Sequence, residues 1–112
     1  LEQIKQWNNE GEFLIKDRTY KLTGLSHQFR VEVLSIYSQI EANIIMGNYQ
    51  FLNRDDFKKV MTKVDDRVLY DGMQLSKLPK HFEEYAEDYL DYIAVSLKLI
   101  VFPFYQTKLT TK

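Results

Sequence analysis

The chain has 112 residues, of which 15 are Lys or Arg and 16 are Asp or Glu, so its formal net charge at pH 7 is −1. This length suits one domain. Because basic and acidic residues balance, the chain lacks the basic excess that is typical of proteins that bind nucleic acids or anionic membranes. Because cysteine is absent, a disulfide framework, a cysteine-based zinc site and a cysteine nucleophile are excluded as well.

Residues 1–11 form a polar leading segment without the apolar core of a signal peptide. Ile4 and Trp7 are three positions apart, so they would share one face of a short helix. Asn9 and Gly11 then predict a break. The segment is interpreted either as a short helix or as loose chain.

Residues 12–23 show the pattern of a β-hairpin. A short apolar run at 13–15 is followed by a polar turn at 16–19 and then by alternating residues. In a strand, this alternation places Tyr20 and Leu22 on the same side.

The next segment, up to Met46, has the spacing of an amphipathic helix. Ser26 is the predicted N-cap, and Gly47 with Asn48 supplies the stop. Apolar residues recur at steps of three and four, as on one face of a helix: Phe29, Val33, Ile36, Tyr37, Ile40 and Ile44. Val31, Leu34 and Ile45 widen this stripe, so we expect the helix to be buried on more than one side.

A second, shorter helix is predicted after a linker at residues 49–52. Asn53 is its expected N-cap, and Asp55 and Asp56 suit its first turn because acids are favoured at the positive end of a helix dipole. The helix is expected to end near residues 65–66. Its apolar positions are Phe57, Val60, Met61 and Val64.

The connection that follows is apolar at residues 68–70 and reaches a turn dipeptide, Asp71-Gly72. This pattern fits a strand or a bridging loop, and the sequence leaves both interpretations open.

A third helix is predicted from Pro79 to Phe102, with Pro103 as its end. Its first half is acidic, and from Tyr92 onward it is apolar nearly all round, over a stretch too short to span a membrane. The expected buried stripe is Phe82, Tyr85, Ala86, Tyr89, Ile93 and Leu97.

Together these patterns predict an α+β fold that is mainly α, in which an N-terminal β-hairpin is followed by a three-helix, bundle-like domain. We expect a single domain over residues 1–112. Its parts are the leading segment 1–11, the hairpin 12–23, the helical domain 26–105 and a flexible tail 106–112.

Patterns of catalytic, metal and cofactor sites are missing from the sequence. His27 and His81 have no partner at metal-ligand spacing and are interpreted as solvated side chains. The acidic pairs lack the spacing of a calcium loop, so helix capping, turns and solvated helix faces account for them. With 4 glycines, no phosphate-binding loop can be built. We therefore predict a protein without enzymatic activity, metal or cofactor.

The apolar C-terminal segment around residues 100–105 has two interpretations. It is either the end of a core helix or a surface that contacts a protein partner, and part of it can serve each purpose. It is also compatible with self-association into a homo-oligomer. The predicted partner-binding residues, chosen for aromatic or apolar character, are Tyr89, Tyr92, Ile100, Phe102, Phe104 and Tyr105.

The order of these features resembles the phage tail assembly chaperones, which attend the tape-measure protein while a tail is built. The resemblance covers about residues 12–105. It is carried by the hairpin with Tyr20-Lys21-Leu22, the helix start at Leu25-Ser26, the connection with Asp71-Gly72 and Leu75-Ser76, and the acidic helix from His81-Phe82 to Phe102-Pro103-Phe104.

The resemblance implies a non-enzymatic protein that binds hydrophobic helical segments of the tape-measure protein in the host cell cytoplasm and is absent from the mature virion. Two alternatives stay open: a structural or adaptor component of a phage tail or baseplate, and a small inhibitor of a host or defence enzyme. No nucleic-acid or membrane partner is expected, because the net charge is near zero and the longest apolar stretch is short.

Overall fold

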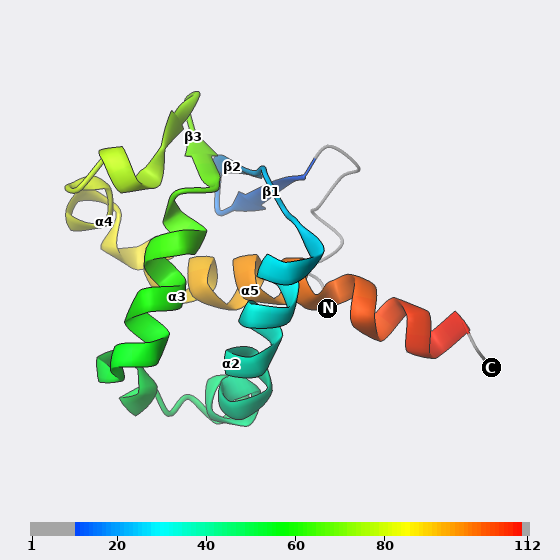
Figure 1. Ribbon diagram of the computed structural model, residues 1–112. Coiled ribbons are helices and arrows are strands. Elements are labelled where there is room, and N and C mark those ends of the chain that lie inside the picture. Colours follow the sequence, from blue (N-terminus) through cyan, green and yellow to red (C-terminus); the bar gives the residue numbers. More distant parts are fainter. Residues whose placement is uncertain (1–10, 111–112) are drawn as a thin grey trace.

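The computed structural model describes the backbone of residues 11–110 and the side chains of residues 11–105, so the prediction for the leading segment lies almost wholly outside the described residues. The fold is α+β and mainly α, as predicted (Figure 1). The elements are β1 (Glu12–Ile15), β2 (Arg18–Leu22), α2 (His27–Met46), the 3-10 helix η1 (Gln50–Asn53), α3 (Asp55–Asp65), β3 (Val68–Tyr70), β4 (Met73–Gln74), η2 (Leu75–Lys77), α4 (His81–Glu84), η3 (Ala86–Asp88) and α5 (Tyr89–Thr110).

The predicted hairpin is confirmed as β1 and β2, which pair antiparallel with Phe13 opposite Tyr20. Their turn consists of Lys16 and Asp17, and Lys16 adopts a left-handed conformation with φ of 57°. Tyr20 and Leu22 both face the core. The alternation of the sequence therefore gave the correct inward face of β2.

Two further strands extend the hairpin into a four-stranded antiparallel sheet with the order β1-β2-β3-β4. The open interpretation of residues 68–70 is thereby decided in favour of a strand, since Tyr70 pairs with Tyr20 of β2. Asp71 and Gly72 connect β3 to β4 with φ values of 53° and 80°. Positive φ at both central residues is typical of a tight hairpin turn, for which Asp-Gly is a preferred sequence.

Helix α2 begins and ends where the sequence predicts. The Ser26 hydroxyl accepts a hydrogen bond from the Phe29 amide at 3.1 Å, which caps the first turn. At the other end Gly47 has φ of 75°, and the Asn48 amide donates to the Asn43 carbonyl at 2.8 Å. This left-handed glycine closes the helix in the usual way.

The predicted cap of α3 at Asn53 is wrong by one residue. Asn53 is the last residue of the 3-10 turn η1, which is closed by a hydrogen bond of 3.0 Å from the Arg54 amide to the carbonyl of buried Phe51. Arg54 therefore becomes the N-cap, with an extended backbone. Its side chain makes no capping bond. Instead Asp56 accepts from the Phe57 amide at 2.7 Å and pairs with Arg54. The end of the helix at Asp65 agrees with the prediction.

The third predicted helix is broken at its start and longer at its end than the sequence suggests. Residues 81–88 form two short turns, α4 and η3, and the long helix α5 begins only at Tyr89. Ala86 is exposed and Tyr85 is half-buried, so both were wrongly assigned to the buried stripe. The break lies at Tyr85, whose backbone is not helical, with φ of −117° and ψ of 51°. His81 and Asp88, on either side of it, both contact the Tyr20 hydroxyl.

Helix α5 also continues past Pro103 to Thr110, so the predicted end at Pro103 is wrong. The backbone of residues 106–110 is helical, and the side chains of the predicted tail lie outside the described residues.

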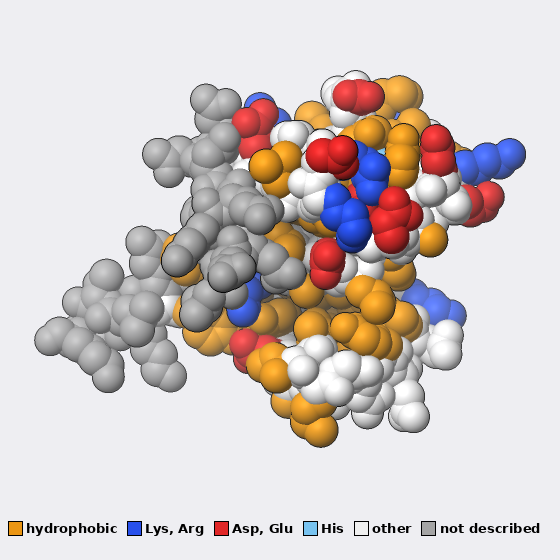
Figure 2. All heavy atoms as spheres, turned by 180° about the vertical axis from the view of Figure 1, so that it is seen from behind, with side chains coloured by type: hydrophobic (Ala, Val, Ile, Leu, Met, Phe, Trp, Pro, Cys, Tyr) orange, Lys and Arg blue, Asp and Glu red, His pale blue; other side chains and the backbone are white. Residues whose placement is uncertain are grey.

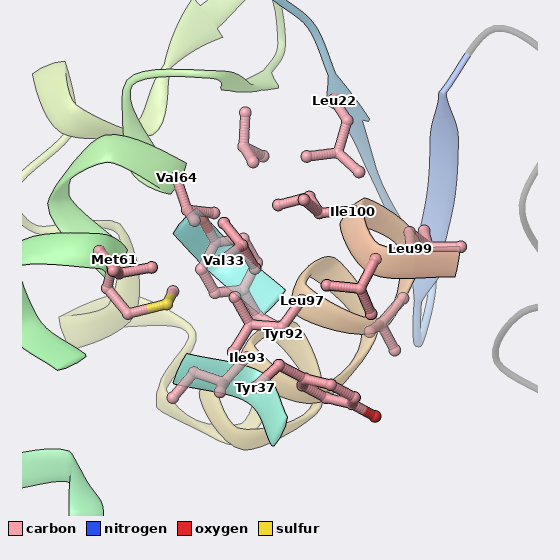
Figure 3. Packing of buried hydrophobic residues seen from close by; sticks show 14 of the residues in the cluster. Leu22, Val33, Tyr37, Met61, Val64, Tyr92, Ile93, Leu97, Leu99 and Ile100 are labelled. Carbon is pink, nitrogen blue, oxygen red and sulfur yellow. The ribbon is translucent and has the colours of Figure 1, made fainter. Parts of the chain in front are cut away.

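The core surrounds α5, which crosses the middle of the molecule below the sheet and beside α2 and α3 (Figure 1). Tyr92, Ile93, Leu97 and Ile100 are enclosed together with Val33 of α2 (Figure 3). Burial on all sides explains why this part of the sequence is apolar nearly all round. Within the described chain, no helix has the length and apolar character that a membrane crossing demands.

Candidate functional site

The structure separates the six predicted partner-binding residues into two groups. Tyr92 and Ile100 are completely buried, so their prediction as surface contacts is wrong. Tyr92 also donates a hydrogen bond from its hydroxyl to Asp65 of α3 at 2.6 Å. The sequence could not reveal this, because an apolar helix face looks the same whether a partner or the chain's own sheet covers it.

The other four residues reach the surface to different degrees. Tyr105 is 37% exposed, whereas Tyr89, Phe102 and Phe104 are half-buried. The Phe104 ring lies 6.0 Å from the ring of His27, centre to centre, at the start of α2. Burial, together with the nearby Glu41 carboxylate of α2, raises the pKa of Tyr105. This end of α5 therefore lies against α2 and is only partly covered.

Helix α2 contributes exposed apolar side chains that sequence reasoning missed. Ile45 and Met46 are 78% and 77% exposed, and Val31 is exposed as well. Val31 and Ile45 are close to four helical turns apart, so they share one face of α2. The prediction that Val31 and Ile45 widen the buried stripe of α2 is therefore wrong, because no other described element covers this face of the helix. We call Val31, Ile45, Met46, Phe104 and Tyr105 the apolar surface set.

A second feature was not predicted at all: a buried polar network centred on Asp88, whose side chain has no exposed area. Arg18 of β2 binds both carboxylate oxygens, with Nε 2.6 Å from Oδ2 and Nη2 2.8 Å from Oδ1. Tyr20 donates from its hydroxyl to Oδ2 at 3.0 Å. The sequence analysis assigned the acidic residues of this segment to a solvated helix face, and for Asp88 this assignment is wrong.

His81 belongs to the same network and is only 7% exposed, so its prediction as a solvated side chain is wrong. Its Nε2 lies 2.8 Å from the Tyr20 hydroxyl oxygen. Because residues 18–20 and 81–88 are far apart in the sequence, no local pattern could bring them together. The network fastens α4 and η3 to the sheet.

The protonation of the network follows from its contacts. The hydrogen bonds from Arg18 hold the pKa of Asp88 below its ordinary value, while burial lowers the pKa of His81. Burial raises the pKa of Tyr20 well above its ordinary value. At neutral pH, Asp88 is therefore ionised, His81 is neutral and Tyr20 keeps its proton. This arrangement stabilises structure, and it offers no activated nucleophile.

A pocket of about 570 Å³ opens beside this network, between the β3–β4 hairpin and α4. Such a volume falls within the range of small-molecule sites. Its lining residues are Tyr70, Asp71, Met73, Lys77, Leu78, Pro79, Lys80, His81, Glu84 and Tyr85.

Basic and acidic side chains gather in one group on the face shown in Figure 2, above an area of hydrophobic side chains. Within the described part of the chain, no three His, Asp or Glu side chains are grouped in a way that would hold a metal ion.

No protein-family model, curated protein or solved structure matches the chain. The family resemblance therefore still depends on the residues quoted for it.

Proposed function

We propose that this chain is a non-enzymatic chaperone of phage tail assembly that binds hydrophobic helical segments of a tape-measure protein. The observation that carries the proposal is the apolar surface set on α2 and α5, in particular Ile45 and Met46, which are more than three-quarters exposed. Large apolar side chains of this kind on a small domain are typical of protein-binding surfaces.

The order of the elements supports the proposal. The hairpin, the long helix after Ser26, the middle connection and the C-terminal helix occur in the sequence order that the resemblance implies. The buried network and the buried Tyr92 hold these elements together, which leaves the outer face of α2 and the exposed side chain of Tyr105 for a partner.

The chemistry of the surface suits a helical partner. Val31 and Ile45 lie along one face of α2, and Tyr105 lies at the end of the neighbouring α5. An apolar surface of this kind binds a partner helix whose apolar residues recur at intervals of three and four, so that they lie on one face. Several copies along one long chain would gain avidity.

The test is co-expression with the proteins encoded beside it, followed by purification and mass spectrometry of what co-elutes. The double variant Ile45→Asp with Tyr105→Asp should lose at least about tenfold in affinity, because both side chains would place a charge in an apolar interface. Leu14→Asp is the matched control, since Leu14 is an exposed apolar residue on β1. It should bind like the parent chain, and unchanged circular dichroism would show that all variants fold.

Analysis of purified virions separates the proposal from the alternative of a structural component. A chaperone acts in the host cytoplasm and is missing from purified virions, whereas a tail or baseplate component stays in them. Binding that is equal in the double variant and the parent chain would reject the apolar surface set as the interface.

A further inference from the structure

The pocket beside α4 contains a hydrogen-bond acceptor whose identity follows from the network. The Tyr20 hydroxyl has one proton, and it donates this proton to Asp88 Oδ2 at 3.0 Å. The contact of 2.8 Å between Tyr20 and His81 must therefore use the Nε2–H of His81 as donor. In neutral His81 the other ring nitrogen, Nδ1, then carries a lone pair and can only accept.

This nitrogen is open to the pocket. Among the described residues, none donates a hydrogen bond to Nδ1 of His81, although the side chain is 93% buried. No described side-chain nitrogen or oxygen atom is both fully buried and without a hydrogen-bond partner. Nδ1 therefore reaches a space that a ligand or water can enter, and His81 lines the pocket.

Aromatic rings hold the imidazole in place. The centre of the His81 ring lies 4.6 Å from that of Tyr70 and 5.1 Å from that of Tyr85. The Arg18 guanidinium, itself fixed by Asp88, lies 4.1 Å from the centre of the Tyr85 ring. These walls are therefore formed before any ligand arrives, which lowers the entropic cost of binding.

The charges around the pocket do not select a charged ligand. Lys77 and Lys80 lie on the lining together with Asp71 and Glu84, so two positive and two negative side chains offset one another. The apolar contacts come from Met73 and Leu78 as well as from the rings.

We propose that this pocket binds an uncharged aromatic ring that carries one N–H or O–H donor, such as an indole or a phenol, with the donor bonded to Nδ1 of His81. The inference is independent of the proposed chaperone function, because the pocket lies on β3, β4 and α4 and the apolar surface set lies on α2 and α5.

Indole and 1-methylindole are the matched probes, since the methyl group removes the donor and keeps the ring. Titration followed by NMR should show saturable binding of indole with a dissociation constant of about 1 mM or lower. It should also show a shift of the His81 Nδ1 resonance. Binding of 1-methylindole should be about tenfold weaker, because an acceptor left without its donor costs roughly that much.

Two substitutions test whether indole binds in this pocket, and neither changes a residue of the network around Asp88. Met73→Asp should abolish indole binding, and Met73 is half-exposed, so the fold will tolerate the change. Val31→Asp, at an exposed position on α2, is the control and should bind indole like the parent chain.

A third probe, N-acetyltryptophanamide, identifies the source of the ring. Tighter binding of this probe than of indole would assign the pocket to an aromatic side chain of a polypeptide, and the reverse order would assign it to a free small molecule. The proposal is overturned if neither indole nor N-acetyltryptophanamide binds saturably, or if 1-methylindole binds as well as indole. It is also overturned if Met73→Asp leaves indole binding unchanged. None of these outcomes bears on the apolar surface set.

Discussion

Asp88 keeps its charge inside the molecule because Arg18 and Tyr20 occupy its carboxylate oxygens. Burying a pair of charges is expensive, and the attraction between them recovers the cost only when the geometry is good and the remaining lone pairs are used. The two-pronged contact from Arg18 meets this condition, and Lys could not reproduce it. At the scale of single residues, the buried charge of Asp88 is therefore compatible with the fold only because Arg18 pairs with it.

The first prediction concerns this pair. Arg18→Met should lower the melting temperature by about 10 °C or more, because Asp88 would be left as a buried charge without its main partner. Arg18→Lys should give an intermediate loss. Thermal unfolding followed by circular dichroism measures both, with exposed Lys59→Met as the control. A loss in Arg18→Met no larger than in this control would contradict the stabilising role of the network.

At the scale of elements, α5 contains a residue that ordinarily ends helices. Pro103 has no amide hydrogen to donate to the carbonyl of Leu99, four residues earlier. The neighbouring Ile100 carbonyl accepts from Nη1 of Arg30 on α2 at 2.7 Å. Packing against α2 therefore carries the helix past a residue at which the local sequence predicted its end.

A substitution at this position tests how much the interruption costs. Pro103→Ala should raise the free energy of unfolding by about 1–3 kcal/mol, because the helix regains an amide donor and loses a steric clash. Urea unfolding measures the change. Pro79→Ala is the control, since Pro79 precedes α4 and interrupts no helix. A decrease in stability for Pro103→Ala would mean that the proline ring itself makes essential contacts.

At the scale of the whole molecule, α5 is tied to α3 by the hydrogen bond from Tyr92 to Asp65. Burial raises the pKa of Asp65 to about 6, from an ordinary value of 3.8. The native state therefore binds more protons than the unfolded state between these two values. The contribution of this group to stability is present at low pH and is lost as the pH rises through about 6.

The Asp65→Asn variant removes this titration and keeps an acceptor for Tyr92. Relative to the parent chain, it should be more stable at about pH 7.5 than at about pH 5, by about 1 kcal/mol. Burial acts in the opposite direction on His81, whose pKa it lowers, but that contribution cancels between the two proteins. Urea unfolding at both pH values gives the difference, with exposed Glu83→Gln as the control. A difference that does not change with pH would show that Asp65 titrates normally.

Local signals in the sequence determined the elements whose ends depend on local chemistry. Ser26 and Gly47 fixed the bounds of α2, and the alternation at Tyr20 and Leu22 fixed the inward face of β2. Caps, left-handed glycines and strand alternation act within a few residues, so they can be read without knowing the rest of the chain.

Only the tertiary structure decided the features that join distant segments. Residues 68–70 became a strand because β2 offered a partner edge, and residues 81–88 are held to the sheet by the contacts of His81 and Asp88 with Tyr20. The same reason separates buried Tyr92 from exposed Tyr105. Both lie in an apolar stretch, and their exposure depends on which elements fold over them, which no local pattern in the chain records.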